Sequence, residues 1–177
     1  MKFNRESKRV RNKEQFDRLI TPHINRLYKA LCAYTSNATA AEDILQECLI
    51  SVFENMHTLK EESKAFAWAY RIAINAANDY FKRYPAHLEF KEEALQGGPD
   101  GLGVEQRADL VRTLKKLDED ERQIIILRDV LGYSYAEIAE MLKLTSTNVG
   151  VRLNRARERL RQLMRQGGYF NGGEEKN

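Results

Sequence analysis

The sequence predicts an all-α protein made of two small helical domains that a flexible linker joins, with a helix-turn-helix in the C-terminal domain. Of the 177 residues only three are proline and ten are glycine, and eight of the glycines fall in two short stretches. The remaining sequence is rich in Ala, Leu, Glu, Arg and Lys, which favour helices. Apolar residues within it recur at the spacing of amphipathic helices.

Turn-forming residues divide the chain into segments. Pro85 bars helix continuation, and residues 96–101 read Gln-Gly-Gly-Pro-Asp-Gly, a run that favours turns. The expected segments are a helical domain at 1–84, a linker at 85–104, a second helical domain at 105–166 and a disordered tail at 167–177.

The composition excludes several classes of protein. Apolar residues make up 42% of the chain and charged residues 31%, which is too apolar for a disordered chain and too charged for a membrane protein. The only cysteines, Cys32 and Cys48, lie far apart in the sequence, which excludes a disulfide scaffold and a Cys-x-x-Cys metal site. The polar, basic N-terminus is unlike a secretory signal. We expect a cytoplasmic protein without membrane insertion.

In the first domain, apolar spacing predicts the helices. A short apolar face comprises Phe16, Leu19 and Ile20. Pro22 then opens a new helix, whose apolar residues are Ile24, Leu27, Tyr28 and Leu31. Another helix begins near Ala38. Its apolar face comprises Ile44, Leu45, Cys48, Leu49, Val52 and Phe53, and its other face carries Glu42, Asp43, Gln46 and Glu47.

The last helix of this domain, at about 64–83, combines aromatic and basic residues. Aromatic side chains can stack on unpaired bases while basic ones hold phosphates. The alternative is that the aromatic residues belong to the core, which we favour for Phe66 and Phe81 and leave open for Trp68 and Tyr70. Residues expected on the surface are Asn75, Asn78, Lys82 and Arg83.

In the second domain, capping residues delimit the helices. Residues 105–117 carry Leu110, Leu114 and Leu117. Asp118, with Glu121 three residues on, caps the next helix, which Gly132 ends. The residues Ser134-Tyr135-Ala136-Glu137 form a capping box. After a break at 143–145, Thr145 or Ser146 caps the last helix, whose apolar residues are Val149, Leu153, Ala156, Leu160 and Met164.

The last two helices match the helix-turn-helix pattern, in which the second helix enters the major groove of DNA. Its exposed candidates are Asn148, Val151, Arg152, Asn154 and Arg155. Arginine can read guanine and asparagine can read adenine by paired hydrogen bonds. Arginines also recur at helical neighbour spacing, and each like-charge pair costs about 0.2–0.5 kcal/mol in an isolated helix. This favours an anionic partner, the alternative being a solvated helical face.

Charge is distributed unevenly although the net charge is only +3. Residues 1–35 carry nine basic and three acidic side chains, whereas 36–65 carry two and six. The acidic helix face indicates a basic protein partner, unless it is simply solvated. The three histidines are scattered, and neither a phosphate-binding loop nor a nucleophile motif is present. We therefore expect no enzyme, no metal and no cofactor.

Four motifs in order resemble bacterial RNA polymerase sigma factors of the extracytoplasmic-function type, within the sigma-70 family. They are Ala41-Glu42-Asp43-Ile44-Leu45-Gln46-Glu47, Trp68-Ala69-Tyr70-Arg71-Ile72-Ala73-Ile74-Asn75 with Asp79-Tyr80, Leu131-Gly132-Tyr133-Ser134-Tyr135-Ala136-Glu137-Ile138-Ala139, and Arg152-Leu153-Asn154-Arg155-Ala156-Arg157. The resemblance covers about 14–165 and implies sigma region 2 in the first domain and region 4 in the second.

The resemblance also implies partners and binding residues. Core RNA polymerase would be a partner through its β′ clamp coiled coil and its β flap. The clamp coiled coil would be bound by a set comprising Glu42, Asp43, Gln46, Glu47, Leu49 and Phe53. The −10 promoter element would be recognised and opened by Lys64, Trp68, Tyr70, Arg71, Asn75, Asn78, Lys82 and Arg83, with Asn75 at an extruded base. The −35 element would be read by Thr147, Asn148, Val151, Arg152, Asn154, Arg155 and Arg157. An anti-sigma factor would be the regulator.

The sequence departs from the family at two places. The loop at 59–64 lacks the Phe-Arg-Gly common before the −10 helix, and Gly150 stands where a basic residue is common. Two other functions remain as alternatives. A free-standing helix-turn-helix transcription factor would bind duplex DNA tightly without polymerase. A helical adaptor without a nucleic-acid role would be insensitive, in any DNA-dependent assay, to substitution of Arg152 and Arg155.

Overall fold

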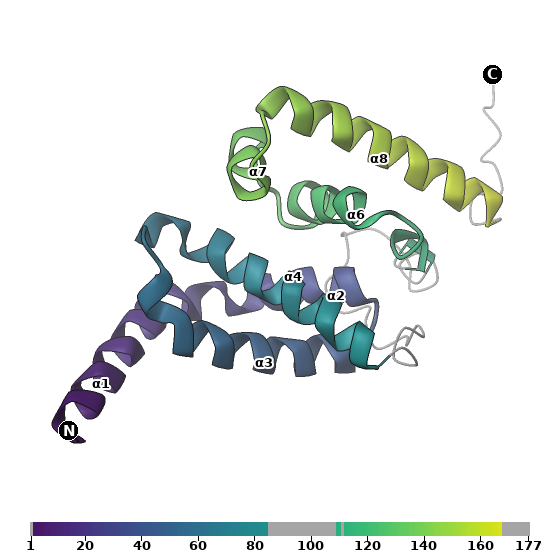
Figure 1. The fold of residues 1–177 in the computed structure, drawn as a ribbon. Coiled ribbons are helices and arrows are strands. Elements are labelled where there is room, and N and C mark those ends of the chain that lie inside the picture. Colours follow the sequence, from purple (N-terminus) through teal and green to yellow (C-terminus); the bar gives the residue numbers. More distant parts are fainter. Residues whose placement is uncertain (1, 85–108, 111, 168–177) are drawn as a thin grey trace.

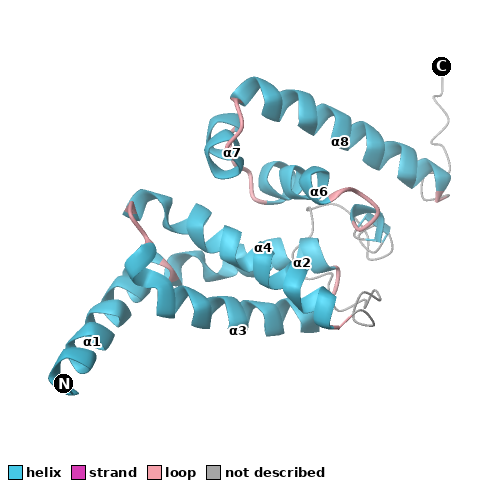
Figure 2. Cartoon of the chain, viewed as in Figure 1, coloured by secondary structure: helices cyan, strands magenta, loops and turns pink. Residues whose placement is uncertain are grey.

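The computed structural model describes residues 2–84, 109, 110 and 112–167, with side chains from Val10 onward. In these ranges every regular element is helical, as predicted (Figure 2). The predicted linker at 85–104 and residues 168–177 of the predicted tail lie outside the described residues. Below, the first half is 2–84 and the second half is 109–167. None of the helices in these two halves is long and apolar enough to cross a membrane.

The first half is a bundle of α2 (Ile24–Thr35), α3 (Ala38–Asn55) and α4 (Ala65–Arg83), from which α1 (Lys2–Leu19) projects (Figure 1). Short 3-10 turns at Thr21–His23, Met56–Thr58 and Glu62–Lys64 connect the helices. The predicted start near Ala38 is confirmed: the Asn37 side chain accepts a hydrogen bond from the backbone N–H of Ala40 at 3.0 Å.

The apolar face predicted for α3 is the one that packs into the core. Ile44, Cys48 and Val52 are fully buried, whereas Leu45, Leu49 and Phe53 are half-buried. The opposite face leaves its polar side chains exposed. We call this the α3 acidic face, and it comprises Glu42, Asp43, Gln46 and Glu47.

The second half contains helical residues at 109–110 and 112–114, followed by α6 (Glu119–Ile125), a π-helical turn η6 (Ile126–Val130), α7 (Tyr135–Leu142) and α8 (Ser146–Gln166). The capping boxes of Asp118 with Glu121 and of Ser134 with Glu137 are both present, as predicted. Gly132 ends the turn with a φ of +75°, which favours glycine.

The π-helical turn was not predicted. The N–H of Leu131 bonds the carbonyl of Ile126 at 3.0 Å, five residues back, instead of the carbonyl four residues back. This wider turn begins within a run of four consecutive apolar residues, 124–127, which are all buried. Because successive residues of an α-helix are 100° apart around its axis, the side chains of 124–127 together point around most of the helix circumference. Burying all four requires protein on both sides, and α8 packs on one side while α2 packs against η6.

The two halves thus pack against one another, with α6 and η6 lying over α2 and α4 (Figure 1). The buried residues of both halves form one continuous cluster. Across this contact the rings of Phe66 and Tyr133 lie 5.3 Å apart, centre to centre.

The helix-turn-helix is formed as predicted. The Thr145 hydroxyl accepts a hydrogen bond from the N–H of Asn148 at 3.2 Å and so caps α8. Val149, Leu153 and Ala156 are fully buried on one side of α8, which fixes the helix on the rest of the second half. Gly150 lies where the helix passes the ring of Tyr135.

Replacing Gly150 by alanine should raise the free energy of unfolding by about 0.5–1 kcal/mol, because glycine costs about this much in a helix interior. A Cβ at position 150 would lie 3.4 Å from Cε2 of Tyr135, which is an ordinary van der Waals contact. Urea unfolding followed by circular dichroism measures the change. The matched control is Gly132→Ala, which should destabilise because of its positive φ. Destabilisation by both variants would show that the Tyr135 ring cannot accommodate the added methyl group.

Candidate nucleic-acid interface

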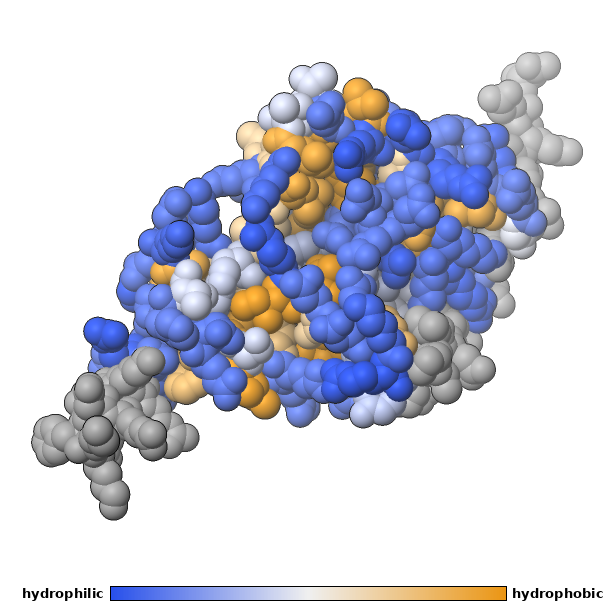
Figure 3. All heavy atoms as spheres, viewed as in Figure 1, coloured by the Kyte–Doolittle hydropathy of each residue, from blue (hydrophilic) through white to orange (hydrophobic). Residues whose placement is uncertain are grey.

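The outer side of α8 presents polar side chains that the buried stripe holds in place. We call these exposed residues the α8 recognition face, which comprises Thr147, Asn148, Val151, Arg152, Asn154 and Arg155. Val151 is 54% exposed, so its methyl groups are available for contact with an apolar group such as a thymine methyl. Most of the α8 surface visible in Figure 3 is hydrophilic.

The arginines of α8 differ in their partners. Arg152 Nη1 lies 3.2 Å from Asp120 Oδ2, and Arg157 Nε donates to Asp129 Oδ2 at 3.1 Å. Arg157 is only half-buried, so it lies at the edge of the face rather than on it. Arg155 is exposed and makes no ion pair with any residue that the structure describes. Of the two arginines on the α8 recognition face, it is therefore the one that no acidic side chain among the described residues engages.

Along α4 and at the residue just before it, six of the predicted −10 residues share one side of the helix because they alternate three and four positions apart. We call them the α4 stripe, which comprises Lys64, Trp68, Arg71, Asn75, Asn78 and Lys82. Asn75 is exposed, whereas Trp68 and Asn78 are half-buried. Arg83 lies off the stripe and pairs with Glu47 at 2.7 Å, which ties α4 to the α3 acidic face.

Tyr70 is not brought to the surface with the others. It is only 3% exposed, and its hydroxyl oxygen is buried without a hydrogen-bond partner in the described part of the chain. Burial raises its pKa well above the usual value, so the phenol is neutral. Tyr70 stacks beside Phe66 at 6.0 Å between ring centres and belongs to the core.

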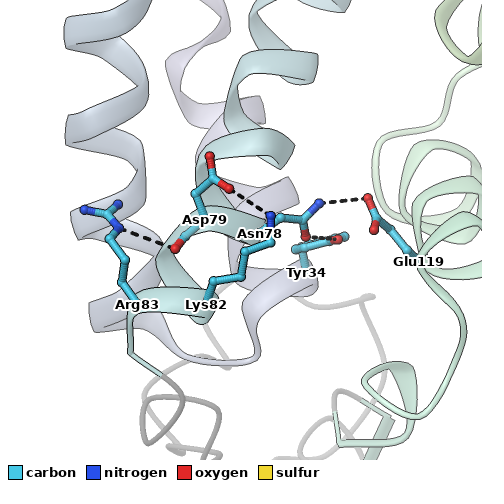
Figure 4. A network of polar contacts seen from close by, with 6 residues as sticks. All are labelled: Tyr34, Asn78, Asp79, Lys82, Arg83 and Glu119. Atoms are coloured by element: carbon cyan, nitrogen blue, oxygen red, sulfur yellow. Dashed lines mark hydrogen bonds and ion pairs between the residues drawn. The ribbon is translucent and has the colours of Figure 1, made fainter.

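Three members of the α4 stripe contact the second half. Lys64 Nζ lies 2.9 Å from Glu140 Oε1, Arg71 Nη2 donates to the Met141 carbonyl at 3.3 Å, and Asn78 Nδ2 donates to Glu119 Oε1 at 2.9 Å. Figure 4 shows Asn78 between Tyr34 and Glu119. The Tyr34 hydroxyl donates to Asn78 Oδ1 at 2.8 Å.

The α3 acidic face has intramolecular contacts of its own. The Tyr28 hydroxyl lies 3.4 Å from Glu42, and the Tyr80 hydroxyl donates to Asp43 Oδ2 at 3.3 Å. These contacts are at exposed carboxylates, so they orient the side chains without removing them from solvent. This face also carries the exposed amide of Gln46, and the apolar Ile50 beside it is 61% exposed. The surface therefore combines charged, polar and apolar side chains.

An ion pair near the α4 stripe was not predicted from the sequence. Arg18 of α1 forms a bidentate pair with Glu62, at 2.6 and 2.7 Å, and so holds the loop before α4. A groove of about 610 Å³ lies between this loop and α1, and its lining includes Arg11, Gln15 and His57. The Arg18 hydrogen bond lowers the pKa of Glu62. The pair joins residues 44 positions apart, and no local pattern in the sequence marks such a contact.

Comparison with known proteins agrees with this geometry. Residues 19–84 match the family model for sigma-70 region 2, and residues 107–160 match that for sigma-70 region 4. The ECF RNA polymerase sigma factor SigM of Mycobacterium tuberculosis is 30% identical over 159 residues, covering 89% of this chain and 80% of SigM. The RNA polymerase sigma factor CarQ of Myxococcus xanthus is 27% identical over 157 residues, and the alignment covers 85% of this chain and 90% of CarQ.

Two solved structures share the fold. The sigma factor RpoE of Bartonella quintana, in complex with the anti-sigma factor NepR, has a TM-score of 0.64 at 22% identity. The alignment covers 85% of this chain and 96% of that one. CnrH in complex with the cytosolic domain of CnrY also has a TM-score of 0.64, at 24% identity, with 90% of this chain and 97% of CnrH covered.

Proposed function

The chain belongs to the extracytoplasmic-function sigma factors of the sigma-70 family, and from this premise we propose how its surfaces carry out promoter recognition. It binds core RNA polymerase, directs it to specific promoters and assists opening of the duplex. The observation that carries this proposal is that two separate helix surfaces, the α8 recognition face and the α4 stripe, lie within the two matched sigma regions.

We assign region 2 to 1–84 and region 4 to 105–166, joined at 85–104. The chain contributes binding and strand separation, while nucleotide polymerisation belongs to the polymerase in the cytoplasm, so no catalytic group is assigned to it. The two binding tasks have different chemistry. Reading the −35 element needs side chains that reach base edges in the major groove, whereas opening the −10 element needs groups that hold an unpaired strand.

The α8 recognition face suits the −35 element. Arg155 and Asn154 are exposed and can each form paired hydrogen bonds to a base edge. Arg152 exchanges its exposed partner Asp120 for a phosphate or base at little cost, because such surface ion pairs contribute at most about 1 kcal/mol. Arg157 remains paired with Asp129 and acts at the edge of this surface.

The α4 stripe suits the −10 element. Trp68 offers a ring for stacking, and Lys64, Arg71 and Lys82 offer phosphate contacts at helical spacing. Asn75 lies between them and is exposed, which is the position required of a side chain that binds an extruded base. Tyr70, being buried, supports the helix from behind.

Replacing Asn75 by alanine should lower the formation of open promoter complexes about fivefold, since a lost hydrogen bond to a base removes roughly 1 kcal/mol. Binding to core polymerase should be unchanged, because Asn75 lies on α4 and not on the α3 acidic face. Permanganate footprinting of the holoenzyme on a promoter measures opening. Asn25→Ala, which removes an exposed amide from α2, is the control. Wild-type opening by the Asn75 variant would reject its assigned role.

The α3 acidic face, together with Leu49 and Phe53, is the surface we assign to the β′ clamp coiled coil. Its carboxylates complement a basic helix surface, and the half-buried apolar residues supply contact area beside them. We further propose contact between region 4 and the β flap. An anti-sigma factor is the proposed regulator, supported by the two structural relatives, which were solved as complexes with NepR and with the cytosolic domain of CnrY.

DNA retention tests this function against a free-standing transcription factor. A pool of duplex genomic fragments is incubated with the chain alone, with core polymerase alone and with both together. We expect sequence-specific retention only with both. Equal specific retention by the chain alone would favour the free-standing transcription factor.

A further inference from the structure

The centre of the α8 recognition face is apolar, whereas the rest of the face is polar. The apolar residue is Val151, which is 54% exposed. Four polar members of the face surround it on the helix surface, because they lie three or four positions from it in the sequence. They are Thr147, Asn148, Asn154 and Arg155. Apolar surface stabilises a protein only when it is removed from water, so the exposed Val151 side chain gains its stabilisation only when a partner covers it.

Beside Val151, at Gly150, the helix carries no side chain. Thr147, Gly150 and Asn154 follow one line along α8, at three- and four-residue spacing, so the missing side chain falls between two exposed members of the recognition face. Glycine is unfavourable in the middle of a helix, and one of its uses in proteins is to let a ligand approach the backbone closely. A base edge can therefore come nearer to α8 at Gly150 than any side chain would allow.

The ring of Tyr135 bounds this position on the side of α7. A Cβ at position 150 would lie 3.4 Å from Cε2 and 3.8 Å from Cδ2 of Tyr135, so one edge of the ring faces Gly150. The ring is held in place by Arg128, whose guanidinium lies 5.3 Å from the ring centre and donates to the Tyr133 carbonyl at 2.8 Å. Tyr135 is nevertheless 37% exposed. We call Tyr135, Gly150 and Val151 together the Gly150 patch.

Positive charges beside the Gly150 patch indicate the class of partner that covers it. Arg152 follows Val151 directly and Arg155 lies one turn further along α8, and both are exposed. A partner that covers the patch therefore also meets two guanidinium groups, which favours an anionic molecule. Duplex DNA meets both requirements, because its phosphates are anionic and its major groove presents the C5-methyl group of thymine to apolar side chains.

We propose that the Gly150 patch reads a thymine of the −35 element through the C5-methyl group of that base. The proposal rests on the assignment of the α8 recognition face to the −35 element in the proposed function. The methyl group lies against Val151 and the α8 backbone at Gly150, with the Tyr135 ring beside it. The sequence preference at this base pair comes from burial of the methyl group, whereas Asn154 and Arg155 read other base pairs by hydrogen bonds.

Replacement of thymine by uracil tests the contact, because uracil forms the same base pair and lacks only the C5-methyl group. The assembled holoenzyme is titrated with duplexes of a promoter that it retains, in which each thymine near −35 on either strand is replaced by uracil in turn. At one of these positions uracil should lower the affinity of the wild-type holoenzyme about fourfold, as expected for burial of one methyl-sized group. In the Val151→Ala variant this loss should shrink to less than about twofold, because the apolar surface that covers the methyl group is reduced.

The matched control is Val10→Ala, since Val10 is 55% exposed, as Val151 nearly is, and lies on α1 outside the α8 recognition face. This control should keep the full loss of affinity on uracil replacement. Insensitivity of the wild-type holoenzyme to uracil at every position near −35 would overturn the proposal. An equal loss in the wild type and in Val151→Ala would also overturn it, because the methyl group would then contact another part of the holoenzyme. Neither result would contradict the proposed function, which fails if the holoenzyme retains no promoter in a sequence-specific manner.

Discussion

Replacing Arg155 by alanine should reduce discrimination between a cognate and a base-substituted −35 element by about 1–3 kcal/mol, which is about 5- to 100-fold in relative affinity. Arg155 is exposed on α8 and has no ion-pair partner among the residues that the structure describes, so its hydrogen bonds are available to a base edge. The measurement is competition binding of the assembled holoenzyme to the two promoters.

The control for this variant is Arg159→Ala, which removes the same charge from an exposed position one turn further along α8. It should weaken binding to both promoters equally, because a phosphate contact carries no sequence information. If Arg155→Ala behaves in the same way as the control, Arg155 contacts the DNA backbone and the base-reading role is rejected.

Replacing Asp43 by lysine should weaken assembly with core polymerase about 100-fold. A like charge placed opposite a basic partner surface costs several kcal/mol. Asp43 is exposed at the centre of the α3 acidic face, so the added lysine would point toward the partner. Fluorescence titration of the labelled chain with core polymerase measures the dissociation constant.

Two controls separate charge from folding in this experiment. In the wild-type protein the Tyr80 hydroxyl donates to Asp43 Oδ2 at 3.3 Å, and Asp43→Asn keeps an oxygen that can accept this hydrogen bond. Asp43→Asn should therefore lower the affinity for core polymerase far less than Asp43→Lys does. Asp17→Lys makes the same charge reversal on α1, away from the face, and should leave affinity unchanged. Undiminished assembly of the Asp43→Lys variant would remove this surface from the account.

The helices could be predicted because their signals are local. The predicted capping boxes at Asp118 and Ser134 are hydrogen bonds over three residues, as is the Asn37 cap that the structure shows at the start of α3. The apolar spacing that predicted the core of α8 through Leu153 depends only on the helical repeat. These features need no knowledge of the rest of the fold.

Features that depend on the contact between the halves could not be predicted. Tyr70 and Trp68 lie two positions apart on a helix with a wide apolar surface, and packing decides that Tyr70 is buried and Trp68 is half-buried. The π-helical turn likewise follows from burial of Ile126 and Leu127 on two sides. Arg26 and Arg122 gave no local signal, because the carbonyls to which they donate, those of Leu131 and Tyr34, lie about 100 residues away.

The structure weakens the argument that repulsion among the arginines of α8 favours an anionic partner. Like-charge spacing along α8 predicted a repulsion that Glu158 relieves only in part, but Asp120 and Asp129 from outside the helix also pair with Arg152 and Arg157. Glu158 pairs with Arg161 within the helix. Much of the repulsion is thus compensated within the protein, and the proposed DNA contact depends chiefly on the exposed, unpaired Arg155.

In vitro transcription tests the central claim most directly. Core RNA polymerase from the same organism is incubated with a pool of genomic fragments, with and without the purified chain, and the 5′ ends of the products are mapped. We predict a defined set of new start sites that share sequence elements near −10 and −35 and that are lost with the Arg155 and Asp43 variants. Products identical to those of core polymerase alone, on every fragment, would contradict the assignment of this chain to promoter recognition.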